Sequence, residues 1–270
     1  MPIRVLIVDD SALVRSVLTD ELQREADIEV IGAVSDVYAA RDRIVLDKPD
    51  VVTLDIEMPR MDGVEFLRRL MPQYPIPVVI VSALATAHAA LTLQALQYGA
   101  VDYVTKPSAR LGTTLAETVQ ELAAKIRVAA KVNVEHYRRQ TRETPRRPIK
   151  NEALARSTDK IVAIGASTGG TIAIESILMR MPADTPGIII VQHMPPVFTR
   201  QFADRLNSVV PMEVKEAESG DRIYRGRVLI APGEQQLTVI RSGGTYLVRC
   251  NDGEKVNGHR PSVSVLLQSV

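Results

Sequence analysis

The chain has 270 residues, enough for two domains that each bury a core of their own. Its formal net charge of +1 at pH 7 excludes a surface that attracts nucleic acid over its whole area. The single cysteine, Cys250, excludes an intramolecular disulfide, and no apolar run reaches the length of a membrane span. The start, MPIRVLIVDD, lacks the organisation of a signal peptide, so we expect a cytoplasmic protein without membrane insertion.

Short apolar runs separated by stretches with helical spacing predict a parallel sheet of βα units in the first half. The runs are Ile3–Val8, Ile28–Val34, Val51–Leu54, Pro77–Val81 and Val101–Thr105. Polar residues stand at the ends of all but the second run: Asp9 and Asp10, Asp55, Ser82, and Lys106 before Pro107. Because the carboxyl ends of parallel strands share one edge, where ligands bind, we expect these polar side chains to converge on one pocket.

That pocket has a specific chemistry. Several acidic oxygens attract a hard cation, and Mg²⁺ prefers a few carboxylates together with phosphate oxygens and water. Asp55 can then accept a phosphoryl group, with Lys106 offsetting its charge and Ser82 hydrogen-bonding it once attached. The alternative is a set of solvated loop acids, which is the usual interpretation of a single aspartate after a strand. Five polar residues at the ends of the predicted strands, in this order along the chain, favour a phosphorylation site instead.

The segments VDDSALVRSVL, LDIEMPRMDGVEFLRRL and VTKP resemble the receiver domain of response regulators. The resemblance implies that Asp55 is phosphorylated and that Lys106 contacts the phosphoryl group. It implies switch positions at Ser82 and Tyr103. It also implies a site for Mg²⁺, formed by Asp9, Asp10, Asp55 and the backbone carbonyl of Glu57.

The end of the receiver is readable from its helices. The helix after Ala87 is expected to end at Gly99, a residue suited to a helix C-terminus. A last helix carries Leu115, Val119, Leu122 and Ile126 on one face. From Arg138 to Lys150 there are six basic residues against one acid, with two prolines and no apolar period. This composition predicts an exposed linker, and because a short basic linker is usually just solvated we expect no nucleic-acid partner.

In the second half, the strand expected at Ile161–Ile164 runs into Gly165-Ala166-Ser167-Thr168-Gly169-Gly170. A helix follows, marked by Ile174, Ile177, Leu178 and Met181. A dinucleotide-binding loop would need glycine where Ser167 stands, so that the backbone could approach the pyrophosphate. The alternative is a nucleophilic serine on a sharp turn, as in G-x-S-x-G, with nearby N–H groups as an oxyanion hole.

A second buried-strand pattern, Gly187–Gln192, is followed at once by His193. If the two strands are parallel, His193 lies at the same edge as Ser167 and can take the hydroxyl proton and return it to a leaving group. The alternative is a structural histidine, the commoner role of a lone one. The other histidines are His88, expected in a receiver loop, His136, just before the linker, and His259, the one competitor to His193.

The segments IGASTGG, VQHMPPVFTRQFADRL, Ser219-Gly220-Asp221 and IAPG resemble the catalytic domain of the chemotaxis protein-glutamate methylesterase family. The resemblance implies that Ser167 is the nucleophile and His193 the base, with Thr168 near the oxyanion site. It implies hydrolysis of glutamyl methyl esters and deamidation of specific glutamines on methyl-accepting chemotaxis receptors. A chemotaxis histidine kinase would be the phosphodonor, and the esterase step would need no cofactor.

The sequence departs from that family at one point. The family's third triad member is an aspartate in a Gly-Met-Gly-x-Asp-Gly motif, which these residues do not contain. Neither Asp221 nor Asp252 matches it, and Ser264 stands where the family usually has an aspartate. Because the chain stops at Val270, we expect a C-terminally truncated methylesterase domain and weak turnover.

The sequence therefore predicts a two-domain α/β protein. Residues 1–130 form a flavodoxin-like receiver with a five-stranded parallel sheet, 131–158 a basic linker, and 159–270 part of a doubly wound α/β esterase domain. Phosphorylation of Asp55 is expected to activate the esterase. Two alternatives remain: a phospho-dependent binding module with poor turnover, and a transcriptional regulator. The second is disfavoured because no compact helix-turn-helix or clustered basic face is visible.

Overall fold

The computed structural model describes residues 1–83, 86–106, 114–135 and 160–270. The chain divides into two compact units, Met1–Thr144 and Pro145–Val270. Most of the predicted linker, and with it His136, lies outside the described residues, so its exposure stays a prediction. In the described part of the chain, every helix is too short or too polar to cross a membrane.

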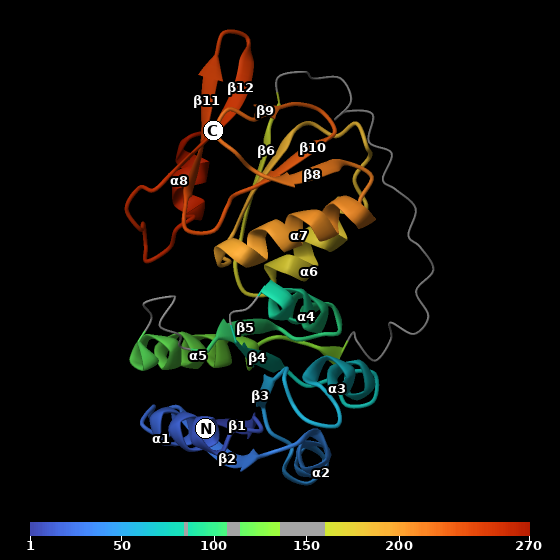
Figure 1. Ribbon diagram of the computed structural model, residues 1–270, viewed down its shortest axis with the longest axis vertical. Helices are drawn as coiled ribbons and strands as arrows, with labels where there is room; N and C mark the ends of the chain where they lie inside the picture. The colour runs from blue at the N-terminus through green and yellow to red at the C-terminus, as the bar shows by residue number, and fades with distance from the viewer. Residues whose placement is uncertain (84–85, 107–113, 136–159) are drawn as a thin grey trace. The chain divides into compact units, whose positions relative to one another are not determined.

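The first unit is built on a parallel sheet with the strand order β2-β1-β3-β4-β5 (Figure 1). Its strands are β1 (Ile3–Val8), β2 (Ile28–Val34), β3 (Val51–Asp55), β4 (Val78–Ser82) and β5 (Asp102–Thr105). Its helices are α1 (Ala12–Leu22), α2 (Val37–Asp47), α3 (Gly63–Leu70), α4 (Thr86–Gln97) and α5 (Leu115–Ala129). Helix α1 contacts α5, while α3 contacts both α2 and α4. The predicted five-stranded parallel sheet is confirmed.

Helices cover the sheet well enough to bury strands β3 and β4 completely, which explains their uninterrupted apolar runs. Helix boundaries follow local signals. Asp62 caps α3, Thr114 and Glu117 form a capping box at α5, and Gly99 follows α4 with a φ of 108°, as predicted. The loop predicted around His88 is wrong. This residue lies within α4, where the neighbouring alanines favour helix.

The second unit combines two sheets. A parallel sheet has the order β6-β7-β10-β8, and an antiparallel one has the order β11-β12-β9. The strands are β6 (Val162–Ala166), β7 (Ile188–Gln192), β8 (Glu213–Glu216), β9 (Arg222–Ile223), β10 (Arg227–Ile230), β11 (Gln236–Ser242) and β12 (Thr245–Asn251). The helices are α6 (Gly170–Leu178), α7 (Pro196–Val209) and α8 (Val263–Gln268). The sequence did not predict the antiparallel sheet, and α6 ends before Met181, which was expected to belong to it.

Helix α8 joins the two sheets of this unit. Its Leu266 is fully buried in a core cluster with Ile189 of β7 and Leu237 of β11. Its Val263 lies so close to β6 that a Cβ built on Gly165 would come within 2.2 Å of the Val263 side chain. In Figure 1, α6 and α7 lie together beside the parallel sheet, and α8 lies beside the β11–β12 hairpin. The second unit is therefore an α/β layer structure, as predicted, with an antiparallel addition fastened by α8.

The position of α8 predicts a contrast between two adjacent leucines. Leu266→Ala should lower the free energy of unfolding by about 2–5 kcal/mol, because it empties a fully buried site. Leu267, which is 52% exposed, should tolerate alanine within about 0.5 kcal/mol. Urea unfolding followed by circular dichroism compares the two variants. Equal losses would show that α8 does not hold the sheets together.

Candidate phosphorylation site and candidate active site

The acidic residues at the strand ends of the first unit do converge. One carboxylate oxygen from each of Asp9, Asp10 and Asp55 lies within 4.8 Å of the other two. Asp9 and Asp55 are buried, whereas Asp10 is exposed. The Lys106 Nζ lies 2.7 Å from an oxygen of Asp9 and 2.7 Å from an oxygen of Asp55. One exposed and two buried carboxylates thus share a pocket with one cation.

The electrostatics of this pocket keep the lysine charged. Burial alone lowers the pKa of Lys106, but hydrogen bonds with Asp55 and Asp9 outweigh it, so the pKa lies above its usual value. Burial raises the pKa of the Asp55 carboxyl, although the hydrogen bond from Lys106 opposes this shift. A group that lowers the negative charge of the pocket, such as a divalent cation, would therefore favour ionised Asp55.

The donor set fits Mg²⁺, because three clustered carboxylates are the hard oxygen ligands that this ion prefers. The backbone N–H of Glu57 donates to the Asp55 carboxylate at 3.2 Å, which places this part of the backbone at the cluster. A cavity of about 430 Å³ opens beside it, with Asp10, Glu57 and Asp62 in its lining. A small molecule can thus approach the cluster from the side of Asp10.

The two predicted switch residues, Ser82 and Tyr103, lie on the neighbouring strands β4 and β5. Ser82 is 1% exposed and ends β4, where its carbonyl accepts a hydrogen bond from the Lys106 N–H at 2.8 Å. Tyr103 is buried in β5, and burial, followed by the charge of Asp102, raises its pKa well above the usual value. The phenol is therefore neutral at every physiological pH. Their switching roles remain predictions.

In the second unit, Ser167 stands where strand β6 turns into helix α6. The Gly170 N–H donates to the Ser167 carbonyl at 2.8 Å, which closes a four-residue turn. Gly169, the third residue of this turn, has φ 74° and ψ −2°, as a type II turn requires. Thr168 occupies the second position. The serine itself is exposed, so the sharp strand–turn–helix expected of G-x-S-x-G is present.

His193 lies at the same edge as Ser167. Strands β6 and β7 are parallel and pair Ala166 with Gln192, so the two candidate catalytic residues each follow a paired residue. The His193 N–H donates to the Ala166 carbonyl at 3.3 Å, which continues the ladder by one step. The imidazole is partly buried. The expected convergence of serine and histidine is confirmed, whereas their catalytic roles remain predictions.

Two neighbours of this pair were missed or misjudged from the sequence. The Gln192 Nε2 donates to the Ser167 carbonyl at 2.9 Å; a polar residue ending the apolar run GIIIV was its only sequence signal. His259 was treated as a competitor of His193, but the two rings stack, with centroids 3.8 Å apart and planes 15° apart. Both histidines therefore belong to one site.

The segment after His193 is fixed by the IAPG segment, which leads from β10 into a loop. The Gly233 N–H donates to the Thr199 hydroxyl at 3.1 Å, and that hydroxyl lies 2.5 Å from a carboxylate oxygen of Glu216. A Cβ on Gly233 would come within 2.7 Å of the Met194 carbonyl, so only glycine allows this approach. The loop thus holds the backbone just beyond His193 in place.

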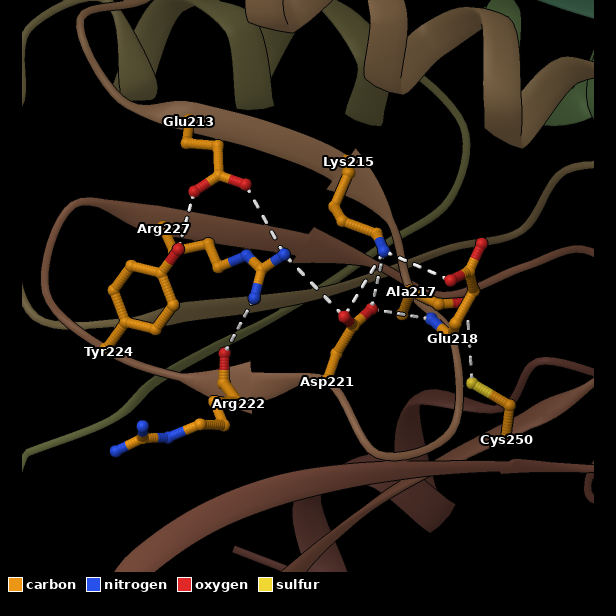
Figure 2. A network of polar contacts seen from close by, with 9 residues as sticks. All are labelled: Glu213, Lys215, Ala217, Glu218, Asp221, Arg222, Tyr224, Arg227 and Cys250. Atoms are coloured by element: carbon orange, nitrogen blue, oxygen red, sulfur yellow. Dashed lines mark hydrogen bonds and ion pairs between the residues drawn. The ribbon is translucent and has the colours of Figure 1, made fainter.

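Asp221, which was not assigned to the triad, belongs to a separate ion network (Figure 2). Its carboxylate lies 3.1 Å from the Lys215 Nζ and 3.6 Å from the Arg227 guanidinium. Asp252 accepts a hydrogen bond from Gln235 at 3.2 Å. Figure 2 also shows Cys250 beside Ala217; burial, then the charge of Asp221, raises its pKa to about 11. A thiol in this state is not a competing nucleophile at neutral pH.

Comparison with known proteins supports the same interpretation of both units. Residues 162–270 match the family described as CheB methylesterase, and residues 5–119 match the response regulator receiver domain. A protein-glutamate methylesterase/protein-glutamine glutaminase from Syntrophotalea carbinolica is 55% identical, over 99% of this chain and 76% of its own length. One of the same name from Sulfurimonas denitrificans is 50% identical, over 100% of this chain and 78% of its own. The chain thus belongs to the CheB methylesterase family, and in it a receiver domain precedes the methylesterase domain.

Proposed function

We propose that this protein hydrolyses methyl esters of glutamyl side chains on chemotaxis receptors and deamidates specific receptor glutamines. The observation that carries the proposal is the placement of an exposed Ser167 and His193 after paired residues of two parallel strands. The names of the relatives support the choice of substrate, since they describe protein glutamate and glutamine side chains. They favour an enzyme over the non-enzymatic binding module considered from the sequence.

The reaction follows from the two side chains. The Ser167 Oγ attacks the carbonyl carbon of the side-chain ester while His193 takes the hydroxyl proton. His193 then gives this proton to the departing oxygen, which leaves as methanol, or to the nitrogen of a glutamine, which leaves as ammonia. Water, deprotonated by His193, attacks the acyl-enzyme and releases glutamate and free Ser167. The Thr168 N–H is our candidate donor to the developing oxyanion.

The first unit supplies control. We propose that a chemotaxis histidine kinase transfers a phosphoryl group to Asp55, and that this transfer raises esterase activity in the cytoplasm. Mg²⁺ would be held by Asp9, Asp10, Asp55 and the Glu57 carbonyl, where it offsets the charge of phosphoryl oxygens when bound. Lys106, already beside Asp55, would contact the attached group, and Ser82 would hydrogen-bond it. Nucleic acid is not part of this scheme.

Phosphorylation predicts a sharp dependence on one carboxylate. Incubation with a small phosphodonor such as acetyl phosphate should label the parent protein only with Mg²⁺, and Asp55→Asn should abolish the base-labile label. Asp20→Asn, an exposed change on α1, should label like the parent. Removing Mg²⁺ with a chelator should abolish labelling without unfolding the protein. Equal labelling of Asp55→Asn and the parent would place the acceptor elsewhere.

Esterase activity predicts that serine and histidine act as a unit. After phosphorylation, Ser167→Ala and His193→Ala should each reduce methanol release by several orders of magnitude. The double variant should lose little more, because each residue is useless without the other. Ser242→Ala, at an exposed hairpin position, serves as the control. Methanol release by Ser167→Ala at the parental rate would show that another group is the nucleophile.

A further inference from the structure

We infer that Gln192 is a positioning residue for Ser167, an inference that rests on the esterase function proposed above. Gln192 ends β7 and is 4% exposed. Its Nε2 donates to the Ser167 carbonyl at 2.9 Å, and the next residue along the chain is His193. The end of β7 therefore provides both the candidate base and a hydrogen bond to the candidate nucleophile.

The Ser167 carbonyl is held from two directions. It accepts from the Gly170 N–H at 2.8 Å, within the turn, and from Gln192 at 2.9 Å, across the sheet edge. A carbonyl oxygen has two lone pairs, so these two donors satisfy it. Because the peptide group is planar and trans, fixing this carbonyl also fixes the Thr168 N–H at the other side of the same plane. Gln192 thereby orients the proposed oxyanion donor as well as the serine.

The direction of the Gln192 amide is also set. Its Oε1 lies beside the first residue of α6: a Cβ built on Gly170 would come within 2.0 Å of it. The positive end of the helix dipole favours the oxygen on that side, and the NH₂ group then faces the Ser167 carbonyl. A flipped amide would put two acceptors against each other. Gly170 therefore leaves the space that this orientation needs.

Packing alone does not explain a glutamine at this position. The preceding residues of β7 are Ile188 to Val191, all apolar and buried, and an apolar side chain would continue that run. Among the described residues, the buried Gln192 Oε1 has no hydrogen-bond partner, which is a free-energy cost to the fold. Within that part of the chain, only the NH₂ group of the amide makes a hydrogen bond, and that bond is to Ser167.

The test compares two replacements of similar size in the full, phosphorylated chain, with a methyl-esterified glutamyl peptide as substrate. Gln192→Met removes the donor and should lower kcat on the order of 10²-fold with KM unchanged, because only the geometry of attack is altered. Gln192→Glu directs a carboxylate at the Ser167 carbonyl and should be worse at about pH 8. As the pH falls, this buried carboxyl, with its raised pKa, becomes protonated and can donate. Its kcat relative to the parent should therefore rise.

Thr185→Val, in the segment that leads into β7, is the matched control. It removes a partly buried hydrogen bond of 2.6 Å from the hydroxyl of the buried Thr185 to the Pro182 carbonyl, so it should lower the melting temperature but leave kcat unchanged. A Gln192→Met protein with kcat within about twofold of the parent would overturn the positioning role. So would a Gln192→Glu ratio that does not change with pH. A parent that releases no methanol, or a Ser167→Ala protein as active as its parent, would instead refute the proposed function.

Discussion

The parallel pairing of β6 with β7 is the constraint on which the proposed active site depends. Parallel strands cannot be joined by a tight turn, so the chain must leave β6 and return through a crossover, which here contains α6. The strand must therefore bend sharply at Ser167, and the next strand must end beside that bend. The hydrogen bond from the His193 N–H to the Ala166 carbonyl records this register. A shift of one residue would turn Gln192 to the opposite face and break its contact with Ser167.

The same constraint builds the candidate phosphorylation site in the first unit. Strands β1, β3, β4 and β5 end at one edge, with β3 paired to β1 and β4, and β4 paired to β5, so the acids and Lys106 meet there. The two sites differ in what balances their charge. In the first unit Lys106 lies between two buried carboxylates, whereas in the second unit the uncharged Ser167 is held through its carbonyl by the Gln192 amide and the Gly170 N–H. One architecture thus positions the candidate phosphoryl acceptor in one unit and the candidate nucleophile in the other.

The site residues at strand ends could be predicted from the sequence, whereas contacts between segments far apart in the chain could not. Asp9, Asp55 and Lys106 in one pocket, and Ser167 near His193, followed from local periodicity and the shared edge of a parallel sheet. The hold of Gln192 on Ser167 depends on register, which periodicity does not give. The stacking of His259 on His193 depends on how the segment after β12 returns to β7. The spacing of residues in the sequence does not show this return, so from the sequence alone the two histidines were alternatives to each other. Ile177 shows the limit of helical spacing: it fits the apolar face of α6 but is 44% exposed.

Cys250 has a practical consequence for experiments on this protein. It is the only cysteine of the sequence, and with a pKa of about 11 only about one molecule in 10⁴ carries its thiolate at pH 7. Maleimide reagents, which react with the thiolate, will therefore modify it slowly. A cysteine introduced at an exposed position such as Leu267 would be labelled selectively, without first replacing the native thiol. The native chain is thus a suitable background for attaching fluorescent dyes or spin labels.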